Sequence, residues 1–165
     1  MKSAIFLSVI ACLLLAACKK DNPSTINGVT FVKNAKTWST TNVGTGFKPL
    51  NTKDTLFIRA QDGEDNIIIA IKQRGAGTYR PDEFRAYYYV TIGMDVIVGQ
   101  YQTYNDPGNS LEISTYDENN HIIKGTFKFV LTSYYIYSNA STRKIAFTNG
   151  KINTQLSDVY FNPFH

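Results

Sequence analysis

From Gly28 onward, apolar and polar residues alternate with a period of two, in short runs separated by turn residues. This alternation constrains the fold more than any other feature, because it is typical of half-buried β-strands. The run 55–61 places Leu56, Ile58 and Ala60 on one face. The run 67–72 carries isoleucines on both faces, which predicts a strand covered on both sides. After the N-terminal segment no long window keeps a helical apolar stripe; 81–85 could form one helical turn at most.

Further alternating runs predict strands at 84–92, 95–103, 134–138 and 144–148, and a hairpin over 110–132. Turn-forming residues separate them, as at 62–66, 75–77, 105–108 and 139–142. Many short strands with regular turns favour an all-β fold, which we predict to be an antiparallel β-sandwich of about 8–10 short strands. A β-barrel-like meander would show the same alternation and stays open as the alternative.

The hairpin over 110–132 also predicts a register. Residues that pair across strands must share a face, which is satisfied when Ile113 lies opposite Gly125 and Thr115 lies opposite Ile123. That register closes an odd-length loop, Glu118-Asn119-Asn120, with Asn120 in the left-handed conformation.

Asn149 and Gly150 form a second turn signal. The dipeptide favours a type I′ turn that would place Phe147 opposite Ile152. A β-bulge inside one longer strand is the competing interpretation.

The first eighteen residues resemble a bacterial lipoprotein signal. Lys2 supplies a positive start, an apolar run that forms a signal helix follows, and Leu15-Ala16-Ala17-Cys18 matches a lipobox. The resemblance implies that the Cys18 thiol is lipidated and that the chain is cleaved between Ala17 and Cys18. The apolar run is shorter than the roughly 20 residues that a membrane-spanning helix needs.

Three segments follow from this interpretation: a signal peptide at 1–17, a lipidated tether at 18–26 and a single β domain at 27–165. Cys12 would leave with the signal and Cys18 would carry lipid, so the β domain would contain neither a disulfide nor a free thiol. The formal net charge of +4 comes from scattered lysines and arginines. Nucleic-acid binding needs a clustered basic surface, so we expect no nucleic-acid partner.

Candidate catalytic residues are few. His121 lies beside a hairpin loop and His165 ends the chain, whereas a catalytic triad needs a histidine held firmly by a third group. No ligand spacing for a metal occurs, and we expect no cofactor. The carboxylates at 62–65 and 82–83 are typical of solvated turns. We therefore expect no enzymatic activity, and a hydrolase built on these carboxylates ranks last among the hypotheses.

Tyrosine is unusually frequent, with eleven in the chain. In the run Tyr87-Tyr88-Tyr89, alternation places Tyr88 with Val90 and Ile92 on the core face, and Tyr87 and Tyr89 on the other. A solvent-facing aromatic pair could stack on sugar rings or peptides, so Tyr87 and Tyr89 are candidate ligand-binding residues. The structural alternative is that they only stabilise the sheet through cross-strand pairs.

Several short motifs together resemble a family of lipoproteins common in Bacteroidota that share an uncharacterised domain. These motifs are Asn34-Ala35-Lys36-Thr37-Trp38, Gly77-Thr78-Tyr79, Lys124-Gly125-Thr126-Phe127-Lys128-Phe129 and Ile145-Ala146-Phe147-Thr148-Asn149-Gly150-Lys151. Ala35 stands where the family has a glycine in the turn before the tryptophan. The resemblance implies an exported, lipid-anchored all-β domain and assigns no activity. We expect Trp38 to lie in the core, Gly77 to adopt a positive φ, and Gly125 to make room for a large side chain on the neighbouring strand or to mark a bulge.

Together these features predict a lipid-anchored cell-envelope protein that acts as a non-enzymatic binding or structural accessory module. The alternative is a carbohydrate- or peptide-binding module that uses Tyr87 and Tyr89. Its expected partners are the membrane, through the Cys18 lipid, and an envelope protein or glycan. Lys19 follows the cysteine where some Gram-negative bacteria place an aspartate for inner-membrane retention, so we expect the outer membrane, with the periplasmic or surface side left open.

Overall fold

The computed structural model describes residues 28–47, 54–72, 75–136 and 143–157. The signal, Cys18, the tether, His165 and the predicted turn at 139–142 lie outside the described residues. The described residues form eleven β-strands: β1 (Gly28–Lys33), β2 (Lys36–Thr40), β3 (Val43–Phe47), β4 (Thr55–Asp62), β5 (Asp65–Lys72), β6 (Gly77–Tyr79), β7 (Phe84–Ile92), β8 (Val96–Thr103), β9 (Ser110–Asp117), β10 (Ile122–Ile136) and β11 (Lys144–Gln155). The described part of the chain contains no helix long and apolar enough to cross a membrane.

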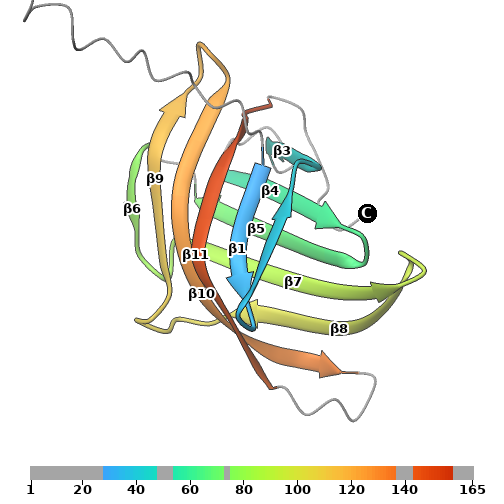
Figure 1. Ribbon diagram of the computed structural model, residues 1–165. Coiled ribbons are helices and arrows are strands. Elements are labelled where there is room, and N and C mark those ends of the chain that lie inside the picture. The colour runs from blue at the N-terminus through green and yellow to red at the C-terminus, as the bar shows by residue number, and fades with distance from the viewer. Residues whose placement is uncertain (1–27, 48–53, 73–74, 137–142, 158–165) are drawn as a thin grey trace, which may run out of the picture.

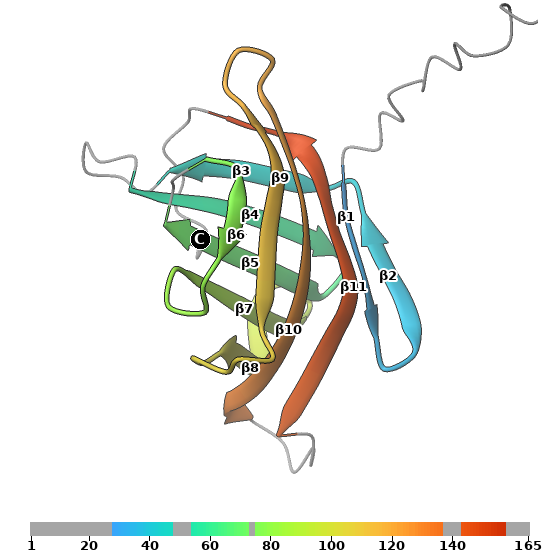
Figure 2. The ribbon, with the colours of Figure 1, turned by 90° about the vertical axis from the view of Figure 1, so that its left-hand side faces the viewer.

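All strands pair antiparallel in one sheet of order β2-β1-β11-β10-β8-β7-β5-β4-β3, with β9 and β6 added beside the first half of β10. Figures 1 and 2 show that the sheet folds over, so that β1 and β11 run across β4, β5 and β7. The predicted all-β antiparallel fold is therefore confirmed, and this arrangement is consistent with a sandwich or a meander. The strand number exceeds the prediction because short pieces such as β6 also pair.

The core lies between the two halves of the folded sheet. Phe31 on β1 stacks on Trp38 and on Phe147, with ring centroids 4.6 and 4.2 Å apart. Phe147 meets Tyr88 of the opposite half edge-on at 5.2 Å. Trp38 is buried as expected. Ile68, on the opposite face of β5 from Ile67 and Ile69, is also buried, which confirms that β5 is covered on both sides at that position.

The β9–β10 hairpin confirms half of the predicted register. Ile113 lies opposite Gly125, but Lys124 lies opposite Thr115 and Ile123 opposite Tyr116. A bulge after Ile113 inserts one extra residue on β9, so the loop at 118–121 has four residues and the predicted odd loop is wrong. His121, not Asn120, adopts the left-handed conformation, at φ 53°.

Asn149 and Gly150 do not form a turn. β11 runs through them, and its pairing with β1 and with β10 shifts by one residue there. The bulge is therefore the correct alternative, with Asn149 at φ 54°. A Cβ on Gly150 would come within 2.4 Å of the Phe127 ring, so only glycine leaves space for that ring. The predicted strand from Tyr134 is likewise the end of the long strand β10.

The turn between β1 and β2 has two residues, Asn34 and Ala35. Lys33 pairs with Lys36, and both loop residues have positive φ, 51° for Asn34 and 61° for Ala35. Such angles identify a type I′ turn, which Ala35 adopts despite its Cβ. Gly77 has the expected positive φ of 141°.

Gly125 lies beside a bulge, which is one of its two predicted roles, but the space that it leaves is filled first by backbone of β9 rather than by a large side chain. A Cβ there would lie 2.4 Å from the backbone oxygen of Glu112 on β9, and the bulge in the β9–β10 pairing lies beside it. Residues 81–83 form a turn, closed by a 2.9 Å hydrogen bond from the Glu83 amide to the Arg80 carbonyl, before β7 begins.

Candidate functional site

The three consecutive tyrosines of β7 face opposite sides of the sheet. Tyr88 is buried in the core, whereas Tyr87 and Tyr89 are half-buried on the outer face, as the alternation predicts. Ile92 was expected to share the core with Tyr88 but is 59% exposed, so that prediction is wrong. The pairing of β5 with β7 ends at Val90, two residues before Ile92.

A tyrosine strip occupies the outer face of β7, β8 and β10. We define it by its five side chains: Tyr87, Tyr89, Gln100, Gln102 and Tyr134. The rings of Tyr87 and Tyr89 stack at 6.5 Å with an angle of 14°, and the two glutamines lie directly across from them on β8. Tyr134 on β10 is half exposed.

The strip favours neutral tyrosine. Burial, and then the neighbouring Tyr134 hydroxyl, raises the pKa of Tyr89 above its ordinary value. The strip therefore offers aromatic rings, phenol hydroxyls and carboxamides without charge. Such groups suit stacking and hydrogen bonding to a neutral polar ligand.

On the inner side, Lys33, Asp65 and Tyr88 form a polar clamp between the two halves of the sheet. The Lys33 ammonium donates to the Asp65 carboxylate at 2.7 Å and to the Tyr88 hydroxyl at 2.5 Å. The Tyr88 hydroxyl in turn donates to the other carboxylate oxygen of Asp65. The ammonium also lies 4.9 Å from the centre of the Tyr88 ring, within the range of a cation–π contact.

The contacts of the clamp favour a structural role over proton transfer. Burial, and then the hydrogen bond to Asp65, raises the pKa of Tyr88 well above its ordinary value. A tyrosine base would need the opposite shift, so Tyr88 stays a protonated donor. The clamp thus joins β1, β5 and β7 through a charge pair whose groups are each satisfied.

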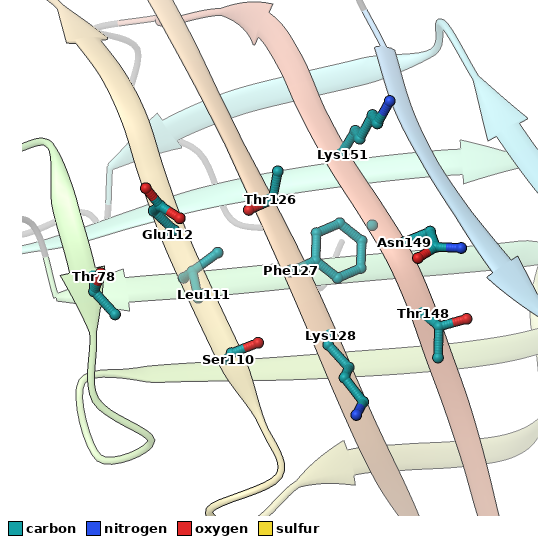
Figure 3. Close-up of a pocket in the computed structure, with 11 residues that line it drawn as sticks. Thr78, Ser110, Leu111, Glu112, Thr126, Phe127, Lys128, Thr148, Asn149 and Lys151 are labelled. Carbon is teal, nitrogen blue, oxygen red and sulfur yellow. The ribbon is translucent and has the colours of Figure 1, made fainter.

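A shallow groove of about 830 Å³ runs over the outer face of β6, β9, β10 and β11 (Figure 3). Phe127 and the Gly150 bulge form part of its lining, and the charged side chains Glu112, Lys128 and Lys151 lie around it. The alternation of apolar and polar residues does not predict this groove. Its polar residues follow the outward positions of alternating strands, but only the folded register brings the four strands together.

The remaining candidates are scattered. His121 is exposed on the β9–β10 loop. Glu64 accepts a 2.9 Å hydrogen bond from the Gly93 amide, and Glu83 accepts one from the Arg80 amide at 2.7 Å. Glu64 and Glu83 act in turns, as predicted, but for Asp65 the prediction of a solvated turn carboxylate is wrong, because this residue begins β5 and its side chain pairs with Lys33 in the partly buried clamp. In the described residues, no group of three histidine, cysteine, aspartate or glutamate side chains could hold a metal ion.

Comparison with known proteins gives one match. The model of a family described as a domain of unknown function, DUF6252, matches residues 22–154, which is most of the chain. No curated protein and no solved structure matches.

Proposed function

This chain belongs to the DUF6252 family, and on that premise we propose that it is a lipid-anchored cell-envelope module with a non-enzymatic binding or structural role. The observation that carries the proposal is the lipobox Leu15-Ala16-Ala17-Cys18, placed ten residues before the first strand at Gly28. One thioether-linked diacylglycerol plus an amide-linked chain would anchor the domain stably, because two acyl chains are needed for lasting membrane attachment.

The polar interior supports a binding or structural role over catalysis. The Lys33 ammonium and the Asp65 carboxylate neutralise each other, and the Tyr88 hydroxyl is held between them. A polar network whose members are paired with one another in this way makes the fold rigid and specific, which is a structural role.

Lipidation is tested by feeding an expressing Gram-negative host an alkyne fatty acid and detecting the label on the full-length protein. We expect labelling of the wild type and its loss in Cys18→Ala. Cys12→Ala is the matched control, because that cysteine lies inside the signal, and it should label like the wild type. Equal labelling of Cys18→Ala would contradict the proposal.

We further propose that the lipid-anchored protein lies in the outer membrane, because lysine rather than aspartate follows Cys18, and that its family is one of exported lipoproteins of Bacteroidota. Density-gradient separation of the inner and outer membranes tests the outer-membrane placement. Protease treatment of intact cells then distinguishes a surface-facing domain from a periplasmic one. Recovery with the inner membrane would refute the placement.

A carbohydrate or peptide ligand on the tyrosine strip is the second candidate. It is favoured by the parallel rings of Tyr87 and Tyr89 and by the exposed ring of Tyr134. Native gel electrophoresis through envelope and dietary polysaccharides would measure retardation. Tyr87→Ala and Tyr89→Ala should each weaken any binding about tenfold. Tyr104→Ala, an exposed tyrosine outside the strip, should leave it unchanged.

A further inference from the structure

The hairpin between β7 and β8 carries apolar side chains into solvent. Six large hydrophobic residues are exposed among the described residues, and four of them lie on this hairpin: Ile92 at 59%, Met94 at 69%, Val96 at 61% and Ile97 at 39%. Figure 1 shows the hairpin projecting beyond the folded sheet. Single exposed apolar residues are normal on a protein surface. A cluster of them on one element instead marks an interaction site.

The conformation of the tip maintains this exposure. Gly93 and Met94 both have positive φ, 64° and 68°. A long side chain in the left-handed region is uncommon, and asparagine or glycine would fit there at lower conformational cost. Glu64 lies in the neighbouring β4–β5 turn, and its carboxylate accepts a hydrogen bond from the Gly93 amide. This bond stabilises the conformation of the β7–β8 turn. The tip is therefore a defined structure that presents Met94 outward.

We infer that this apolar tip inserts into the interfacial region of a lipid bilayer. The inference rests on the proposed function, because the lipid on Cys18 supplies the membrane. Residues 19–27 span at most about 30 Å even when fully extended. A domain of this size has a radius of gyration of about 14 Å. The tether is therefore about as long as the domain is wide, which keeps the domain close to the membrane surface.

The charges near the tip favour a neutral lipid surface. Asp95 lies between Met94 and Val96, and the Glu64 carboxylate is close behind it. These two acidic groups would be repelled by anionic headgroups. The tip should therefore contact zwitterionic lipid through its apolar side chains, with Asp95 at the level of the headgroups.

The test uses the full-length lipidated protein reconstituted into phosphatidylcholine vesicles. Since Cys12 leaves with the signal and Cys18 carries lipid, Met94→Cys would provide a single free thiol for an environment-sensitive fluorophore such as NBD. We expect a blue shift of emission on reconstitution and quenching by lipids with a doxyl group at a shallow acyl position. Glu118→Cys, on the separate β9–β10 loop, is the matched control and should show neither change.

A second variant tests the apolar contact itself. Adding Val96→Asp and Ile97→Asp to Met94→Cys should abolish the blue shift and the quenching while the lipid still holds the protein on the vesicle. Circular dichroism of each variant checks the fold. If vesicles did not change the NBD emission at Met94→Cys, the inference would be overturned. The apolar tip would then be a contact site for a protein partner. Because vesicle attachment is measured separately, this result is distinct from a failure of lipid anchoring.

Discussion

Tyr88 and its neighbours Tyr87 and Tyr89 are the same residue type on the same strand, in two very different environments. Tyr88 faces inward and is held by Lys33 and Asp65 against the aromatic core. Tyr87 and Tyr89 face outward and stack on each other. The difference teaches that stability is concentrated on the inner face of the folded sheet, whereas the outer face is available for contacts.

The sharpest test of this contrast is truncation of an aromatic ring on each face. Phe147→Ala should lower the free energy of unfolding by about 3–5 kcal/mol, because its ring is fully buried against Phe31 and Tyr88. Tyr134→Ala on the outer face should change it by no more than about 0.5 kcal/mol. Urea unfolding measures both, and equal losses would erase the distinction between the faces.

Removing one hydroxyl compares the tyrosines directly. Tyr88→Phe should cost about 1–3 kcal/mol, because the hydroxyl joins both charged partners of the clamp. Tyr87→Phe should cost less than about 0.5 kcal/mol. The Lys33 ammonium and the Asp65 carboxylate remain paired in Tyr88→Phe, so the protein should still fold.

The clamp also predicts an alkaline effect. The pKa of Tyr88 is raised in the folded state, so between about pH 10 and that raised value the folded chain keeps a proton that the unfolded chain releases. Its contribution is therefore fully present below about pH 10 and is lost as the pH rises. Tyr88→Phe should flatten this alkaline loss in a pH series of unfolding curves. If the free energy of unfolding of Tyr88→Phe fell with pH as steeply as that of the wild type, Tyr88 would not be the source of the alkaline loss.

The turn beside the clamp offers a gain in stability. Ala35 has a φ of 61°, where a Cβ is disfavoured. Ala35→Gly should raise the free energy of unfolding by about 0.5–1 kcal/mol, the relief of strain exceeding the entropy cost of glycine. Ala86→Gly, in the buried part of β7, is the control and should lower it by a similar amount. A loss at both sites would show that the turn is not strained.

The smallest effect should come from the outer β9–β10 loop. The side chain and then the amide of Asn120 donate to the Asp117 carboxylate and lower its pKa. This contribution is present above about pH 4, the ordinary value, and is lost as the pH falls. Asp117→Ala should therefore reduce Tm slightly at pH 7 and make little difference at pH 2, while Glu118→Ala should change neither. If Asp117→Ala destabilised the protein more than Tyr88→Phe does, the expected ranking of the two effects would be wrong.

The sequence predicted the strands well because alternation is a local property. The arms of β4, β5, β7 and β8 lie where the patterns of apolar residues and turns placed them. The errors fall at bulges. A residue inserted after Ile113 and another near Asn149 changed a loop length and removed a turn, since both alternatives have the same local pattern.

The residues of the candidate site also divide into those that the local pattern predicted and those that only tertiary contacts brought together. Alternation alone placed Tyr87 and Tyr89 outside and Tyr88 inside. It could not place Lys33 beside Asp65, because these residues are 32 positions apart and meet only when β1 crosses β5. It also assigned Ile92 to the core, because it did not show that the pairing of β7 with β5 ends two residues earlier, at Val90.

The sequence by itself determined the antiparallel all-β class, most strand positions and the inward or outward direction of Tyr87, Tyr88 and Tyr89, because these depend on a two-residue repeat. Tertiary structure alone decided the fold-over of the sheet, the clamp, the outer groove and the exposed tip of the β7–β8 hairpin. Those features depend on which distant strands pair, in which register, and where each layer ends. Such information comes from packing energies summed over the whole chain, and no local window contains it.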